Sequence, residues 1–209
     1  QTTDSCGDEI IERKRVKKVP EKKAYEVHKL APRIVSIAKE LKIYHFVDIG
    51  AGQGYLDFAI LDTDEQFVIT AVEREKEQLL GLARRRSCQH RMHITELDVN
   101  AETSLSAFQK TISCMHEYVM FSLHSCGSLS DHMCRLFVQD HKARALVCVG
   151  CCHNLITAPP YPQSQRMTGF ELNSQQLMAA CQVPMRWTFD RQSVLLTELK
   201  NYYRSLLEV

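Results

Sequence analysis

The chain has 209 residues, of which 44% are hydrophobic and 24% charged, as in an ordinary globular domain with a substantial core. These proportions exclude collagen-like, disordered and coiled-coil chains. The formal net charge of +1 gives no overall field that favours nucleic acid or a membrane surface. No apolar run approaches the roughly 20 residues of a membrane-spanning helix, so we predict no membrane partner.

Nine cysteines are an odd number in a chain long enough to fold without disulfide staples. We therefore predict reduced thiols and an intracellular, reducing compartment, whether cytoplasm, nucleus or organelle matrix. The first residue is Gln and no signal peptide is visible, which leads us to expect a piece of a longer protein.

The amino-terminal part is basic. Residues 1–23 are polar and unpatterned, and we predict an extension there, followed by one domain over residues 24–209. Between positions 13 and 29, eight Lys or Arg stand against two Glu. Apolar residues spaced by three and four from Val27 to Leu41 predict a helix that Pro20 opens, and Pro32 suggests a kink or a break in it.

After this helix, apolar strand-like segments alternate with helical ones. The predicted strands cover residues 44–49, 67–72, 92–99, 118–123 and 143–149. The predicted helices lie near residues 55–61, 75–86, 101–115, 129–139 and 173–181. Apolar strands separated by helices indicate an α/β fold, a doubly wound and mostly parallel Rossmann-like sheet covered on both faces, with strand order 3-2-1-4-5.

The most informative segment joins the first strand to the next helix and reads Asp48-Ile49-Gly50-Ala51-Gly52-Gln53-Gly54. Glycines there allow a tight turn and a close backbone approach to a ligand. Glu73 ends the second predicted strand, where an acid suits ribose hydroxyls, and Asp98 ends the third. The D-x-G-x-G-x-G spacing differs from the dinucleotide fingerprint G-x-G-x-x-G and resembles motif I of class I S-adenosylmethionine-dependent methyltransferases.

This resemblance implies S-adenosylmethionine as the cofactor and methyl transfer as the reaction. It implies a methionine pocket shaped by the turn, the ribose on Glu73 and the adenine beside Asp98. Lys22 and Lys23 suit binding of RNA phosphate or of the cofactor carboxylate. They fit equally well the ordinary, solvent-exposed start of a basic helix. The residues expected to bind the cofactor are Asp48, Gly50, Ala51, Gly52, Gln53, Gly54, Glu73, Asp98, Val99 and His124.

Three further elements resemble the methyltransferase-like protein 25 family, also described as ribosomal-RNA adenine dimethylase domain-containing. They are Lys22-Lys23-Ala24-Tyr25-Glu26, Leu123-His124-Ser125-Cys126-Gly127-Ser128-Leu129 and Val149-Gly150-Cys151-Cys152-His153-Asn154-Leu155. Tyr25, Ser128 and His153 depart from the family's usual His, Asp and Tyr. The resemblance implies RNA as methyl acceptor, and we expect the basic stretch over residues 13–29 to contact RNA or a ribonucleoprotein.

His124, Cys126 and Asn154 follow the fourth and fifth predicted strands, and we predict that they line the acceptor pocket and act in catalysis. A turn cap packed under the cofactor is the alternative role for His124. Zinc ligation by Cys126, Cys151 and Cys152 with His124 and His153 is disfavoured, because the spacing is not C-x-x-C and adjacent residues of a strand point to opposite faces. We therefore predict no metal site.

Two other functions fit the same motifs. One is a catalytically silent methyltransferase-fold module that binds within a ribonucleoprotein. The other is a methyltransferase of proteins or small molecules. An intact glycine turn with Glu73 favours cofactor binding in each of these cases.

Overall fold

The computed structural model describes residues 20–86, 90–157, 163–167, 169, 171–181, 195–196, 198–200 and 202–203. Most of the expected basic extension, residues 1–19, therefore lies outside the described residues. The first described helix, α2, spans Glu21–Leu41 and so includes the last three residues assigned to that extension. The division of the chain at residue 23 stays a prediction.

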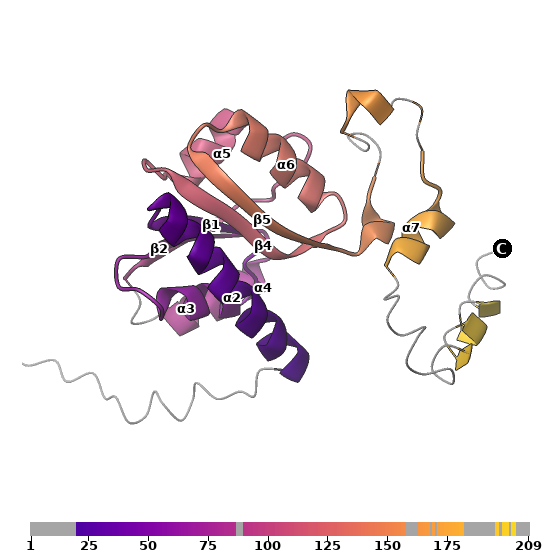
Figure 1. Ribbon diagram of the computed structural model, residues 1–209, viewed down its shortest axis with the longest axis horizontal. Helices are drawn as coiled ribbons and strands as arrows, with labels where there is room; N and C mark the ends of the chain where they lie inside the picture. Colours follow the sequence, from indigo (N-terminus) through magenta and orange to yellow (C-terminus); the bar gives the residue numbers. More distant parts are fainter. Residues whose placement is uncertain are drawn as a thin grey trace, which may run out of the picture.

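Five parallel strands form one sheet in the order β3-β2-β1-β4-β5, which confirms the predicted fold class and strand order (Figure 1). The strands are β1 His45–Ile49, β2 Val68–Glu73, β3 Met92–Glu96, β4 Tyr118–Cys126 and β5 Ala143–Cys151. Because all five run the same way, their carboxyl ends meet at one edge, where ligands of such sheets bind. β4 is longer than predicted and carries His124 and Cys126 to that edge.

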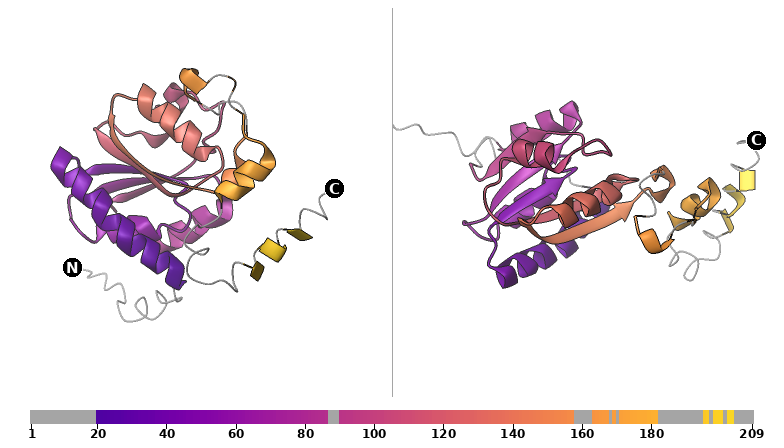
Figure 2. Two further views of the ribbon diagram at one scale, coloured as in Figure 1. Left: turned by 45° about the vertical axis from the view of Figure 1, so that its right-hand side comes forward. Right: turned by 90° about the horizontal axis from the view of Figure 1, so that it is seen from above.

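Helices cover both faces of the sheet (Figures 1 and 2). On one face lie α2, α3 (Tyr55–Leu61) and α4 (Lys76–Arg86); on the other lie α5 (Leu105–Ile112) and α6 (Leu129–Gln139). Two short 3₁₀ helices, η1 (His153–Leu155) and η2 (Gln165–Met167), and α7 (Ser174–Ala180) follow β5. The figures show these last segments beyond the carboxyl end of β5.

Alternation along the central strand builds two separate cores. Phe46 packs with α2 and α3 on one face, whereas Val47 and Ile49 pack with α5 and α6 on the other. Each of these three side chains is at most 2% exposed, and full burial of such a side chain contributes about 1.5–3 kcal/mol. β1 is therefore fixed from both sides, and the turn that follows it starts from a rigid support.

α2 continues through Pro32, so a break at this residue, one of the two outcomes suggested, is wrong. Pro32 lies on the exposed face of the helix. The backbone carbonyl that loses its N–H partner there faces water and is not left buried without a hydrogen bond. Buried residues on the opposite face, Ala31, Ile34, Val35 and Ala38, hold the helix against the sheet on both sides of the proline. Packing thus outweighs the lost helical hydrogen bond.

α5 begins four residues later than expected, because polar side chains satisfy the backbone before it. The Asn100 amide donates to Thr103 Oγ1 at 3.0 Å, and the Glu102 amide donates to Asn100 Oδ1 at 2.9 Å. Ser104 then caps the helix by accepting from the Ala107 amide at 3.2 Å. Such side-chain turns compete with helix formation, so residues 101–104 form a loop above β3.

The edge strand β5 departs from the expectation of a sheet covered on both faces. After the buried Ala143, its residues are partly or fully exposed. Its cysteines Cys148 and Cys151 are half-buried. All cysteines within the described ranges are unpaired thiols. No helix among the same residues combines the length and apolar character needed to cross a bilayer.

Candidate functional site

The structure brings every predicted site residue to the carboxyl edge of the sheet. Asp48 lies one residue before the end of β1, Glu73 ends β2, and Asp98 follows β3. His124 and Cys126 belong to the end of β4, and Asn154 lies in η1 just after β5. This edge therefore has a half built from β1, β2 and β3 and a half built from β4 and β5.

The glycine turn is hydrogen-bonded to β2. The amides of Gly50 and Ala51 both donate to the Val72 carbonyl, at 2.8 and 3.1 Å. Gly54 adopts a left-handed φ of 72° as the N-cap of α3, and a Cβ there would collide with Leu82. A Cβ on Gly52, φ 57°, would meet nothing within 4 Å, so the backbone is bare and faces open space. This open backbone of the turn, Gly50–Gly54, forms a cradle that allows the close approach of a ligand.

Glu73 links the turn to the end of β2 and is only 7% exposed. Its Oε2 accepts from the Gly52 amide at 2.8 Å, and its Oε1 accepts from the amides of Arg74 and Glu75 at 2.8 and 3.0 Å. A carboxylate oxygen has two acceptor positions, so Oε2 keeps one for a hydroxyl group. The carboxylate is thereby oriented beside the cradle.

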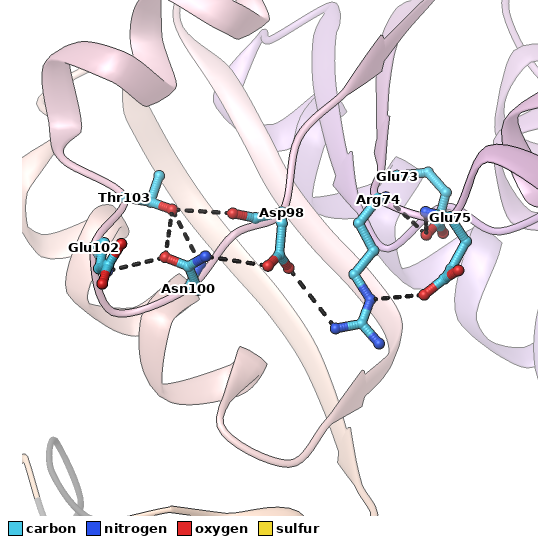
Figure 3. Close-up of polar contacts among 7 residues, drawn as sticks. All are labelled: Glu73, Arg74, Glu75, Asp98, Asn100, Glu102 and Thr103. Carbon is cyan, nitrogen blue, oxygen red and sulfur yellow. Dashed lines mark hydrogen bonds and ion pairs between the residues drawn. The ribbon is translucent and has the colours of Figure 1, made fainter.

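Asp98 lies across the same edge from Glu73 (Figure 3). Between them, the Arg74 guanidinium contacts Glu75 at 3.2 Å and Asp98 at 3.8 Å. Asn100 Nδ2 also donates to Asp98 Oδ2, at 3.1 Å. The Asp98 side chain is 54% exposed and remains accessible. Val99 next to it is buried in the core.

Gln53, one of the residues expected to bind the cofactor, contacts side chains of α3 and α4 instead. Its Oε1 accepts from Arg85 Nη2 at 2.8 Å and from the Tyr55 hydroxyl at 3.4 Å. Arg85 and Lys23 lie over the Tyr55 ring, with their cationic atoms 4.1 and 4.7 Å from its centroid. The cluster ties the turn to α4 and places two cations next to it.

Asp57, in the first turn of α3, was not among the predicted site residues. It is fully buried near Asp48, and unpartnered oxygens lie on both carboxyls, Oδ1 of Asp48 and both oxygens of Asp57. Burial raises the pKa of Asp57 to about 7, and burial with the neighbouring Asp57 and Glu73 raises the pKa of Asp48 well above its usual range. A protonated carboxyl can donate to its neighbour. The signal in the sequence was one acid within the apolar run Leu56–Leu61.

On the other half of the edge, an irregularity in β4 directs His124 toward α2. The pairing of β4 with β5 advances three residues on β4, from Ser122 to Ser125, against two on β5. Such a bulge re-aims side chains. His124 Nε2 lies 3.4 Å from Glu26 Oε2, and Lys22 contacts the other oxygen of Glu26 at 3.6 Å. Glu26 was also missed as a site residue, although it ends one of the quoted sequence elements.

Three thiols meet where β4 and β5 end. The Sγ atoms of Cys126, Cys151 and Cys152 all lie within 4.8 Å of one another, and those of Cys126 and Cys151 are 3.2 Å apart. The expectation that adjacent cysteines diverge assumed that both belong to the strand. β5 ends at Cys151, and Cys152 adopts a left-handed φ of 50°, which turns its side chain back to the same side.

Asn154 lies close to this cluster but contacts α7. Its side-chain Oδ1 accepts from Cys181 Sγ at 3.2 Å, and its backbone N–H donates to the same sulfur at 3.3 Å. The side chain thus holds the end of α7 against η1. Its action on an acceptor stays a prediction, as do the roles of His124 and Cys126.

The chain is similar to one protein family and to several solved structures. The profile of a family described as a methyltransferase domain matches residues 22–159. Among solved structures, the chain is similar to the 23S rRNA methyltransferase ErmE, with 13% identity and a TM-score of 0.44 over 59% of this chain and 46% of that one. It is also similar to Podospora anserina methyltransferase PaMTH1 bound to SAH, with 11% identity and a TM-score of 0.44 over 71% and 72% of the two chains.

A third similar structure is the plantazolicin methyltransferase BpumL in complex with a triazolic desmethylPZN analogue and SAH. Its identity is 15% and its TM-score 0.46, over 83% of this chain and 61% of that one. At these identities the likenesses concern the fold alone. The chain spans less than half the length of ErmE.

The fold and the glycine turn at its carboxyl edge define a class I methyltransferase. The profile match covers more than half of the residues, so the chain belongs to the methyltransferase-domain family. The predicted methyltransferase class, and S-adenosylmethionine as its cofactor, are thereby confirmed.

Proposed function

We propose that the protein binds S-adenosylmethionine over β1, β2 and β3 and passes its methyl group to RNA held over β4 and β5. The observation that carries this proposal is the buried Glu73 carboxylate, which accepts from the Gly52 amide at 2.8 Å beside an open backbone cradle. The free acceptor position of Glu73 suits a ribose hydroxyl. A carboxylate and bare glycine backbone at this point fit a nucleoside joined to an amino acid better than a pyrophosphate.

The cofactor half assigns a role to each predicted residue. Gly50, Ala51, Gly52 and Gly54 would enclose the methionine part, and Asp98 with the Val99 backbone would border the adenine. Asp48 lies buried near Asp57, in the strand that leads into the turn, and would border the site from there. Gln53 acts indirectly, by fixing Arg85 and Tyr55 near the cradle. When bound, the cofactor supplies an electrophilic methyl group on a sulfonium.

The acceptor half would position the nucleophile. Methyl transfer is an in-line displacement, so alignment and exclusion of water supply most of the rate enhancement. His124, oriented by Glu26, would contact the acceptor and take its proton where the acceptor must lose one. Cys126 stands two residues further along β4, at the same edge.

RNA as acceptor is supported by the cations and tyrosines around the first turns of α2. Lys22 is 85% exposed in its side chain, Lys29 lies 5.6 Å from the ring centre of the exposed Tyr25, and Lys23 with Arg85 flanks Tyr55. Cations bind phosphate and tyrosines stack on unpaired bases. The elements shared with the methyltransferase-like protein 25 family point the same way, and the unpaired thiols suit an intracellular, reducing compartment.

The test supplies the chain with labelled S-adenosylmethionine and three separate acceptor pools: total RNA, total protein and small metabolites. We expect label in RNA that ribonuclease releases and protease does not, and we expect the Lys22→Ala/Lys29→Ala double variant to weaken RNA binding most at low salt. Label in protein or metabolites would overturn RNA as acceptor. Tight binding of S-adenosylhomocysteine with no labelled pool would identify a silent binding module instead.

A further inference from the structure

We propose that Cys126, Cys151 and Cys152 form a three-thiolate site for a thiophilic divalent cation of the Zn²⁺ type. This inference is independent of the methyl acceptor and reverses the expectation of metal-free thiols. Zinc binds thiolates at about 2.3 Å, which places sulfur atoms of a tetrahedral site roughly 3.8 Å apart. The three sulfurs lie within 4.8 Å of one another, so side-chain rotations alone would bring them to that spacing.

The fold builds this cluster from backbone that is already fixed. Cys126 and Cys151 are partners in the β4–β5 register, and the Gly127 amide donates to the Cys151 carbonyl at 3.1 Å just beyond them. Gly127 has a left-handed φ of 54°, and a Cβ there would lie 2.6 Å from the Leu155 carbonyl oxygen. The two chain segments that carry the thiols are therefore packed directly against each other.

Cys152 is brought to the cluster at a conformational cost. Its φ of 50° is a left-handed conformation, which is unfavourable for a residue with a Cβ. Such strain persists where the surrounding structure imposes it and is concentrated at functional sites. Here the result of the strain is the convergence of a third thiol on a pair that two neighbouring strands already form.

The exposure of the thiols suits an exchangeable, open metal site. Cys126 and Cys152 are exposed and Cys151 is half-buried, so a cation can enter from solvent. Three protein ligands leave the fourth tetrahedral position to water or to an incoming group, as in catalytic rather than structural zinc sites. His124 lies on the same strand end, two residues before Cys126. A bound cation would thus sit at the edge to which we assign the acceptor.

The chief competitor is a disulfide between Cys126 and Cys151, whose sulfurs are 3.2 Å apart. Forming it removes two protons and two electrons, which a disulfide or peroxide oxidant must accept. That reaction uses two thiols and leaves Cys152 without a role. Metal binding uses all three thiols, so the contribution of Cys152 separates the two.

The experiment uses the whole chain, purified with a phosphine reductant and without chelator. Zinc content is measured by elemental analysis, and the metal-stripped chain is titrated anaerobically with Co²⁺, whose absorption reports thiolate ligands and tetrahedral geometry. The variants are Cys126→Ser, Cys151→Ser and Cys152→Ser, and the matched control is Cys134→Ser, an exposed cysteine on α6 outside the cluster. Circular dichroism checks that each variant is folded.

We expect about one equivalent of metal in the parent and the control, with thiolate-to-cobalt charge-transfer bands. Each cluster variant should bind Co²⁺ more weakly by roughly tenfold or more, since even the outer partners of metal ligands contribute that much. A folded parent chain without stoichiometric metal, and without these bands on titration, would overturn the site. So would a Cys152→Ser variant with unchanged affinity, or a Cys126–Cys151 disulfide that forms in preference to metal binding under these conditions.

Discussion

His124 Nε2 lies 3.4 Å from Glu26 Oε2 and so joins the end of β4 to the second turn of α2. The two residues are almost a hundred positions apart in the chain, and a bulge in β4 directs the imidazole to its partner. Both side chains are partly exposed, 43% for His124 and 25% for Glu26, so water screens the pair and its contribution to stability is small. The contact therefore orients the ring rather than holding the fold.

Replacing either partner should lower the methyl-transfer rate without lowering the affinity for the cofactor. His124→Ala would remove contacts made with the acceptor in the transition state, and Glu26→Gln would leave the imidazole less well oriented. We expect kcat to fall in both variants and the calorimetric affinity for S-adenosylhomocysteine to stay unchanged. Glu21→Gln, at an exposed position one turn earlier on α2, is the control. If His124 merely caps a turn, its variant will lose thermal stability and activity together.

Glu73→Gln should weaken cofactor binding by about 1–3 kcal/mol, because a buried acceptor for a hydroxyl group is lost. The substitution keeps the size of the side chain and one oxygen, so the backbone amides around it are not all left unpaired. Calorimetry with S-adenosylhomocysteine measures the effect, with Glu75→Gln as an exposed neighbouring control. Unchanged affinity in a folded variant would remove Glu73 from the site. If the parent protein bound NAD more tightly than S-adenosylhomocysteine, the proposed cofactor would be wrong.

The sequence predicts the sheet well, and it places the residues proposed for the cofactor half at one edge of that sheet, because both depend on local patterns. Apolar strands with helices between them determine a parallel sheet, and parallel strands bring their carboxyl ends to one edge. Glu73 and Asp98 could thus be placed from their positions after predicted strands. Their distances and partners required the structure.

The missed residues depend on contacts or conformations that no local pattern encodes. Asp57 gains its raised pKa from burial under the folded sheet and helices, and Glu26 gains its histidine partner from a bulge in a strand far along the chain. Cys152 reaches the other thiols only because it leaves the strand in a left-handed conformation. Spacing rules for strands and metal motifs assume regular backbone, and these sites lie where that regularity ends.

Two glycines of the turn should respond differently to alanine. In both, a left-handed φ makes a Cβ costly by about 1 kcal/mol or more. Gly54→Ala adds a collision with the buried Leu82, and overpacking costs typically about 1–3 kcal/mol. Gly52→Ala meets open space instead, so it should fold but fill the cradle and lose cofactor affinity. Urea unfolding and calorimetry separate the two effects; equal stabilities would contradict the assigned packing.

The buried pair of Asp48 and Asp57 should make the stability of the protein depend on pH. Burial raises the pKa of Asp57 to about 7, whereas the pKa of an aspartate in the unfolded chain is about 3.9. Between these values the folded state holds a proton that the unfolded state has released. The free energy of unfolding therefore falls as pH rises from about 4 to about 7, by at most about 1.4 kcal/mol per pH unit for one proton.

Asp57→Asn should remove the part of this dependence that comes from Asp57, because an amide of the same shape carries no titrating proton, whereas the part that comes from the buried Asp48 stays. We expect the variant to gain stability relative to the parent as pH rises through this range, with the largest difference above pH about 7, where the parent buries a charge. Urea unfolding at a series of pH values gives the two curves. Asp62→Asn, an exposed carboxyl directly after α3, is the matched control, and its curve should run parallel to the parent's. If the Asp57→Asn curve is parallel as well, the pair does not share a proton in the folded state.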